Sequence, residues 1–255
     1  MSNKKIGLVL SGGGARGIAH AGVLKALDDL EIPVSLISGT SSGAMVAVLY
    51  ASGIKPEEMI PIVKKSKLFK IGELSFDMKG LLKTRAFKKI VQDNIKVKTF
   101  EELNIPVTVC STDFTNGQTI FFNSGTLMEP LVASCAIPLI FSPVIMNGNV
   151  MVDGGLLNNL PVEPLIGKCR HIIGVHANPL GTFKGTRFKG MLERCFQMAI
   201  MNNTKTKSVA CDLFLEPKEL SNYSVFDTVH AKEIFNIGYQ ATMNKKSTLL
   251  KMIED

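Results

Sequence analysis

Residues 33–51 read PVSLISGTSSGAMVAVLYA, and this stretch decides the fold. An apolar, strand-like run comes first, Gly39-Thr40-Ser41-Ser42-Gly43 follows, and residues 44–51 are helix-like. Small residues on both sides of Ser41 fit a strained strand-to-helix turn, because larger side chains would collide there. The following helix would direct its free N–H groups and the positive end of its dipole towards the serine. The stretch therefore predicts a nucleophile elbow that carries Ser41.

Strand-like and helix-like segments alternate on both sides of this elbow. Strands are expected at 6–10, 32–38, 106–112, 118–122, 144–152 (a hairpin), 171–176 and 212–215, and helices at 17–30, 42–51, 85–95, 127–135, 188–209 and 227–253. Alternation of this kind predicts an α/β fold in three α/β/α layers with a mostly parallel central sheet. We expect a single domain, with a core over residues 5–210 and a C-terminal strand and helix, 211–255, packed on it.

Composition limits the class of protein. At 255 residues with 45% apolar and 20% charged residues, the chain resembles an ordinary folded domain. Its five cysteines include no Cys-x-x-Cys pair, which favours reduced thiols. The apolar run at 6–10 is too short for a signal peptide, and prolines interrupt the longest apolar stretch, 131–146. We therefore expect a cytoplasmic protein, with peripheral membrane contact at most.

Positive charge is concentrated between residues 64 and 98. This segment holds eleven lysines and arginines against three acids, so it accounts for the whole net charge of +7. Apolar residues such as Leu68, Phe69 and Leu81 lie among the basic ones. Two interpretations stay open: a solvated helical face with a few core anchors, or a lid or docking surface for an anionic membrane or an acidic substrate. Nucleic acid is not expected as a partner, because no binding motif accompanies the charge.

A glycine loop, Gly12-Gly13-Gly14-Ala15-Arg16-Gly17, follows the first expected strand. It fits the Gly-x-Gly-x-x-Gly pattern of dinucleotide sites. Such a site needs an acidic residue at the end of the second strand, where this chain has the serine elbow instead. The alternative is an oxyanion hole, in which the N–H groups of Gly12, Gly13 and Gly14 face a carbonyl oxygen. Arg16 would add charge there or brace the loop.

A third turn, Asp153-Gly154-Gly155, follows the strand-like residues 150–152. The spacing alone is compatible with a catalytic acid or with a plain turn. Ligands bind at the carboxyl ends of parallel strands, so the three turns are expected to converge on one site. Asn158 and Asn159 are expected to cap or orient the Asp153 loop.

The three turns together resemble the patatin-like phospholipases. SGGGARG (residues 11–17), GTSSG (39–43), DGG (153–155) and the following NLP (159–161) have the order and context of that family, over roughly residues 5–179. The resemblance implies the patatin-like fold and a Ser–Asp dyad acyl hydrolase, with Ser41 as nucleophile, Asp153 as base and the Gly12–Gly14 loop as oxyanion hole. It makes the remaining glycines structural parts of the motifs: Gly17, Gly39, Gly43, Gly154 and Gly155. Plant patatins begin the glycine loop with Asp, whereas this chain has Ser11.

The competing arrangement is a Ser–His–Asp triad. His176 is the best candidate for its histidine, because it ends a strand and the order Ser41, Asp153, His176 matches that of α/β-hydrolases. A free carboxylate is a weak base for a hydroxyl, so a dyad requires desolvation of Asp153 and a good oxyanion hole. We favour the dyad.

The sequence thus predicts a serine hydrolase of lipid or other acyl esters that works through an acyl-enzyme on Ser41. No metal or cofactor is expected, since no metal-ligand spacing is found. Two alternatives remain: an acyltransferase that uses the same dyad, and a lipid-, nucleotide- or acyl-carrier-binding regulator with a vestigial serine.

Overall fold

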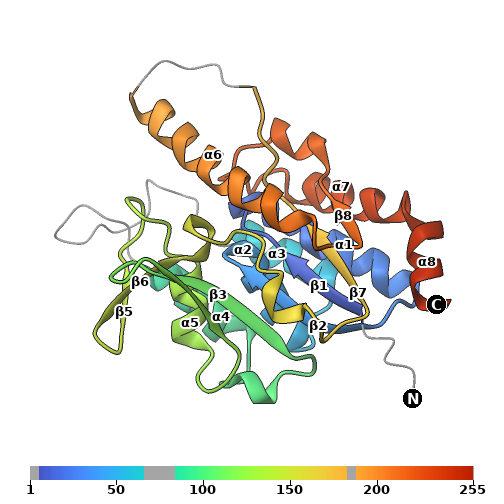
Figure 1. Cartoon of the computed structure of the whole chain (residues 1–255), viewed down its shortest axis with the longest axis horizontal. Helices are drawn as coiled ribbons and strands as arrows, with labels where there is room; N and C mark the ends of the chain where they lie inside the picture. Colours follow the sequence, from blue (N-terminus) through green and yellow to red (C-terminus); the bar gives the residue numbers. More distant parts are fainter. Residues whose placement is uncertain (1–5, 66–83, 183–187, 255) are drawn as a thin grey trace.

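The computed structural model describes residues 6–65, 84–182 and 188–254. Within them an eight-stranded sheet has the order β5-β6-β3-β2-β1-β7-β8, with β4 paired to β3 (Figure 1). The strands are β1 Ile6–Leu10, β2 Val34–Thr40, β3 Val107–Asp113, β4 Gln118–Phe122, β5 Val144–Met146, β6 Asn149–Asp153, β7 His171–Val175 and β8 Leu213–Leu215. The five strands β3-β2-β1-β7-β8, neighbours in that order in the sheet, are parallel. Strands β4 and β6 pair antiparallel with β3, and β5 pairs antiparallel with β6. The mostly parallel sheet that the sequence predicts is confirmed.

Strand register brings two of the three predicted turns together. Thr40, the last residue of β2, pairs with Cys110 of β3, and Asp153, the last residue of β6, pairs with Ser111. Since Cys110 and Ser111 are consecutive, both strands end at adjacent positions on β3. The direction of β6 differs from the one assumed in the sequence argument, because β6 runs antiparallel to β3. The Asp153 turn reaches the elbow through this pairing and not through parallel strand ends.

The helices and short 3₁₀ turns complete the layers. The α-helices are α1 Ile18–Asp29, α2 Ser42–Ala51, α3 Met59–Lys65, α4 Arg85–Asn94, α5 Met128–Ser134, α6 Phe188–Ser208, α7 Ala231–Met243 and α8 Lys246–Glu254. The 3₁₀ turns are η1 Gly14–Gly17, η2 Pro56–Glu58, η5 Phe100–Glu102, η6 Gly154–Leu156, η7 Glu163–Leu165 and η8 Lys218–Asn222. One face of the sheet packs on α1, α2, α7 and α8 in the main hydrophobic core. In Figure 1, α1 (blue) lies beside the carboxyl-terminal helices (red).

The opposite face of the sheet has a thinner cover. Val9 of β1 and Ile172 of β7 pack there against Leu160, Val162 and Leu165, which belong to the segment after Asp153. Helix α6 lies over the same segment, and its Asn203 bonds to the backbone of Gly155 and Asn159. The loop that carries Asp153 is therefore part of the outer layer and is fixed from both sides.

Helix α2 is buried almost all round. Seven of its ten residues are buried, including Ala44, Ala47 and Val48, and no charged residue lies in it. A helix without a polar face fits only in a protein interior. Because α2 is packed on nearly all sides, the position of the Ser41 turn directly before it is fixed.

One predicted helix differs from the structure. The segment 227–253, predicted as one helix, forms α7 and α8 with a break at Asn244 and Lys245. Both helices carry an apolar stripe, and the break lets Leu249 and Met252 reach the main core.

The lid or membrane contact predicted for residues 64–98 falls largely on 66–83, which lie outside the described residues; α4 covers the described later part.

Candidate active site

Ser41 lies between β2 and α2 with a backbone φ of 53°, a conformation rare for a residue with a side chain. Glycine is required on both sides of it. A Cβ at Gly39 would lie 2.7 Å from the backbone nitrogen of Ala44, and one at Gly43 would collide with the carbonyl oxygen of Leu10. The Ser41 N–H donates to Ser134 Oγ at 2.8 Å, and that hydroxyl donates to the Cys110 carbonyl at 2.6 Å. The strained turn is thus fixed by hydrogen bonds from α5 and β3.

Asp153 lines the same cavity as Ser41, and the Ser41 hydroxyl acts on its carboxyl group to lower the pKa. The carboxylate accepts the Gly155 N–H at 2.7 Å, and the side chain of Asp153 is buried. Burial raises the pKa of Asp153 to about 6, while Ser41 and the Gly155 N–H act in the opposite direction. A carboxylate with this pKa is a stronger base than an ordinary aspartate and is still ionised at neutral pH.

The glycine loop lies on the other side of Ser41. The Gly12 N–H donates to Asn159 Oδ1 at 3.0 Å, so it is already engaged. Among the described residues, no acceptor takes a hydrogen bond from the N–H groups of Gly13 or Gly14, and both glycines line the cavity at Ser41. Gly14 has a φ of 59°, and a Cβ there would collide with the Val225 carbonyl. Gly13 and Gly14 are thus the amides free to meet an oxyanion.

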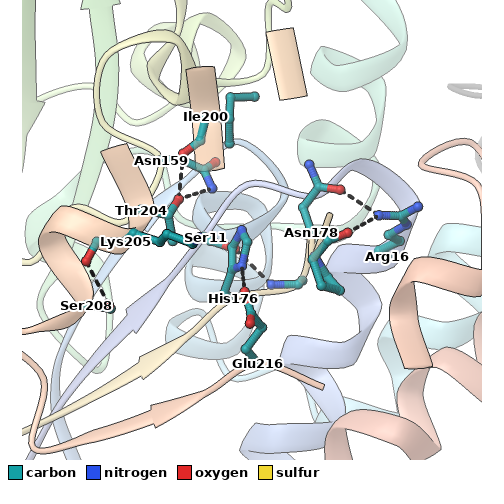
Figure 2. Close-up of polar contacts among 12 residues, drawn as sticks. Ser11, Arg16, Asn159, His176, Asn178, Ile200, Thr204, Lys205, Ser208 and Glu216 are labelled. Atoms are coloured by element: carbon teal, nitrogen blue, oxygen red, sulfur yellow. Dashed lines mark hydrogen bonds and ion pairs between the residues drawn. The ribbon is translucent and has the colours of Figure 1, made fainter. Parts of the chain in front are cut away.

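Asn159 connects the glycine loop to α6. Its Nδ2 donates to Thr204 Oγ1 at 3.1 Å, and Thr204 donates to the Ile200 carbonyl at 2.8 Å (Figure 2). These bonds fix the orientation of the amide, so that its oxygen accepts from Gly12. Asn158 instead holds the Glu163 carboxylate through its Nδ2. The roles of Ser134 and Thr204 were missed in the sequence, because no motif marks them.

Arg16 points away from the oxyanion position. Its Nη1 donates to Asn178 Oδ1 at 2.7 Å (Figure 2). Its Nε donates to the Tyr223 carbonyl at 2.8 Å. These contacts join the glycine loop to two later segments of the chain. Of the two roles considered for Arg16, the geometry matches bracing.

The histidines lie outside this arrangement. His176 is fully buried, and its Nδ1 lies 2.9 Å from Glu216 Oε1 (Figure 2). His20 contacts the Ser11 carbonyl through Nε2 at 2.8 Å, and burial lowers its pKa to about 4. Neither histidine is among the described residues that line the cavities at Ser41.

Two cavities meet at Ser41. The outer cavity holds the glycine loop, Asp153 and the amide side chains of Asn178 and Gln197. The inner cavity follows α2 into the core, has almost purely apolar walls and contains about 700 Å³ of space, some of it open to solvent. Four residues of the apolar stretch 131–146 line one or both cavities: Cys135, Ile137, Ile140 and Phe141. A reactive carbonyl at Ser41 would therefore have amide groups on one side and an almost purely apolar wall on the other.

No group of three or more His, Cys, Asp or Glu able to hold a metal ion occurs within residues 6–65, 84–182 and 188–254. In the same ranges, none of the helices has the length and apolar character needed to cross a bilayer.

Comparison with known proteins gives relatives of one kind. An uncharacterised NTE family protein of Mycobacterium tuberculosis is 32% identical over 168 residues, 65% of this chain and 47% of that protein. Lysophospholipase NTE1 of Kluyveromyces lactis is 26% identical over 94% of this chain and 19% of its own length. Neuropathy target esterase sws of Drosophila melanogaster is 32% identical over 69% of this chain and 13% of its own. The chain thus spans less than half the length of these relatives.

Solved structures agree on the fold. Human GIVD cytosolic phospholipase A2 superposes with a TM-score of 0.55 at 13% identity, covering 98% of this chain and 59% of that one. VipD from Legionella pneumophila gives 0.53 at 15% identity, over 96% and 67%. A family model described as patatin-like phospholipase matches residues 8–166, which include all three predicted turns. The chain therefore belongs to the patatin-like phospholipase family.

Proposed function

We propose that this protein hydrolyses fatty acyl esters, with Ser41 as nucleophile and Asp153 as its base. The observation that carries the proposal is that Ser41 shares a cavity with a buried carboxylate, Asp153, whose pKa is raised to about 6. The names of the relatives, lysophospholipases and esterases, support the same class of substrate. Family membership supports a lipid hydrolase and leaves the dyad as part of the proposal.

In the proposed reaction, Ser41 Oγ attacks the ester carbonyl while its proton passes to Asp153. The carbonyl oxygen becomes negative and meets the free N–H groups of Gly13 and Gly14, at the positive end of α2. Collapse of the tetrahedral intermediate breaks the ester C–O bond, and the alcohol leaves with the proton from Asp153. A water molecule then attacks the acyl-enzyme, Asp153 takes its proton, and the fatty acid leaves as Ser41 regains a proton.

The environment of Asp153 supports its role as base without a histidine. Burial disfavours the charged form of the carboxylate, so proton transfer from Ser41 relieves an unfavourable charge. The Gly155 N–H donates to Asp153 Oδ1 at 2.7 Å, and this hydrogen bond fixes the orientation of the carboxylate. His176 is held by Glu216 instead.

Fluorophosphonate labelling tests this proposal. The wild type should react at Ser41, Ser41→Ala should not react, and Asp153→Asn should react about 10²–10⁴ times more slowly, the usual contribution of a positioned base. Ser52→Ala, at the other end of the same helix, is the matched control and should label as the wild type does. Hydrolysis of p-nitrophenyl butyrate should follow the same order. Labelling that survives in Ser41→Ala would overturn the proposal.

A further inference from the structure

The inner cavity follows one side of α2 away from Ser41. Four α2 residues line it, Ser42, Met45, Val46 and Leu49. Their spacing is that of a single helical stripe, so they form a continuous wall along the helix axis. Its first residue is adjacent to the nucleophile and its last lies two turns further into the core.

Helix α3 also lines the inner cavity. Its residues Met59 and Ile62 belong to the same wall as Leu49, and Met59 is completely buried. The side wall contains Phe87 and Phe141, whose rings pack edge to face with centroids 5.0 Å apart. No charged side chain occurs among the described residues that line this cavity. Such a space favours a hydrocarbon chain.

The outer cavity is also largely apolar, since its wall includes Ile137, Ile140, Ile200, Val225 and Phe226. It differs from the inner cavity in the amide groups of Asn178 and Gln197 and in the free glycine amides. With the carbonyl between Ser41 and these amides, the alcohol portion of an ester fits the outer cavity. The acyl portion is then directed along α2.

The length of the wall can be compared with that of an acyl chain. Leu49 follows Ser41 by eight positions, and a rise of 1.5 Å per residue gives about 12 Å along the helix. With carbon–carbon bonds of about 1.5 Å, an extended chain advances about 1.25 Å per carbon. The cavity therefore matches an acyl chain of roughly eight to ten carbons.

We propose that Leu49 and Met59 set the acyl chain length that the enzyme accepts, with a limit at about eight to ten carbons. The inference rests on the proposed ester hydrolysis at Ser41. Each methylene up to the limit enters the cavity and raises kcat/KM roughly two- to fourfold, and further carbons add nothing or lower it. Leu49 and Met59 thus select among substrates without touching the reacting atoms.

The test is the dependence of kcat/KM on chain length for p-nitrophenyl esters from acetate to palmitate, each below its aggregation concentration. In the wild type, kcat/KM should rise with the number of acyl carbons up to a break at eight to ten carbons, beyond which it no longer rises. Leu49→Ala, which opens the end of the cavity, should move the break about two to three carbons longer, and Met59→Ala should also lengthen it. Leu49→Phe should move it shorter. Each rate is expressed relative to that of the acetate ester in the same variant, because the acetyl group is too short to reach Leu49 or Met59.

The control is Leu27→Ala, a buried α1 leucine that does not line the cavity. It creates a core void of the same kind, so it reports the effect of lost stability alone and should leave the break unmoved. A break that stays in place in all three cavity variants, or a rate that still rises through palmitate in the wild type, would overturn the inference while ester hydrolysis stands. If the wild type cleaves no ester and does not label at Ser41, the proposed function itself fails.

Discussion

The backbone N–H of Gly12 donates a hydrogen bond to the side-chain oxygen of Asn159, 147 positions later in the chain. The bond ties the glycine loop to the segment that follows Asp153. Thr204 fixes the Asn159 amide from α6, so three parts of the chain meet at this point. The positions of the amides of Gly13 and Gly14 relative to Ser41 therefore depend on residues that do not face the substrate.

Removal of the Asn159 contact should lower the rate without removing the nucleophile. Asn159→Ala frees the glycine loop, and we expect kcat for p-nitrophenyl butyrate to fall about 10- to 100-fold with KM little changed, because oxyanion stabilisation acts in the transition state. Fluorophosphonate labelling should slow by a similar factor.

Thr204→Val provides a finer version of this test, because it leaves Asn159 in place and removes only the group that orients its amide. We expect kcat to fall about tenfold. Thr242→Val is the matched control: Thr242 is also buried and bonds the carbonyl four residues earlier, but on α7. Equal loss of kcat in both threonine variants would mean that stability, and not the Asn159 amide, is responsible.

The pH dependence of kcat/KM should report the base. Burial raises the pKa of Asp153 to about 6, so its carboxylate is protonated and inactive below that pH. We expect kcat/KM to rise with pH through an apparent pKa of about 6 and then to level off. A neutral ester measured from pH 4.5 to 9 tests this. The inflection should persist in His176→Ala; its loss in that variant would point to histidine as the titrating group.

The free energy of unfolding should depend on the protonation of the same carboxyl group, and the raised pKa sets the direction of that dependence. Because the pKa of Asp153 is raised on folding from 3.8 to about 6, the folded state binds the proton more tightly. The contribution of Asp153 is then most favourable below pH 3.8 and is lost as the pH rises through 6. The gap corresponds to about 3 kcal/mol, so Asp153→Asn should gain up to about that much stability relative to wild type between pH 4 and 7.

Urea unfolding of both proteins at several pH values measures this gain. Asp113→Asn is the control of opposite sign. Hydrogen bonds from the Asn116 side chain and from the N–H groups of Asn116 and Thr115 hold the pKa of Asp113 low. That substitution should lower stability at neutral pH. A loss of stability in Asp153→Asn at pH 7 would show that its carboxylate is not an unfavourable buried charge.

Some of the site could be predicted from local sequence because its physics is local. The strained turn at Ser41 needs small neighbours, and those glycines are adjacent in sequence. The strand and helix around it have strong apolar patterns, so their bounds were close to those observed. Asp153 was found for an incomplete reason, since its strand is antiparallel and only the pairing of Ser111 brings it to Ser41.

The rest depends on contacts between distant segments. Ser134, Asn159 and Thr204 carry no pattern that reveals their hydrogen bonds, because their partners lie far away in sequence. Residues of α2, α3 and α4 line the inner cavity together. The spacing of apolar residues along the chain does not predict that these three helices share a cavity. The break between α7 and α8 could not be predicted either, because the same spacing of apolar residues runs through both helices.

The crossing of α1 and α7 should be intolerant of a methyl group. A Cβ at Gly22 would collide with the Phe235 carbonyl, and one at Gly238 with the Ala19 carbonyl. Alanine normally stabilises a helix by about 1 kcal/mol over glycine, but forcing these backbones apart costs more. We expect Gly238→Ala to lower the free energy of unfolding by about 1–3 kcal/mol. Ser247→Ala, exposed on α8, should leave it equal or slightly higher; a stabilised Gly238→Ala would contradict the close crossing.

Substitution of His176 should separate the dyad from a triad. Its Nδ1 faces Glu216 at 2.9 Å and its ring stacks on Phe214, so its contacts are those of a core residue. We expect His176→Ala to lose about 1–3 kcal/mol of stability, because the partner Glu216 is left partly buried. Its kcat, measured well below the unfolding temperature, should stay within about tenfold of wild type, whereas Asp153→Asn should lose 10²-fold or more. Circular dichroism confirms folding in both variants. A folded His176→Ala with a 10³-fold lower kcat would assign the base to histidine and refute the dyad.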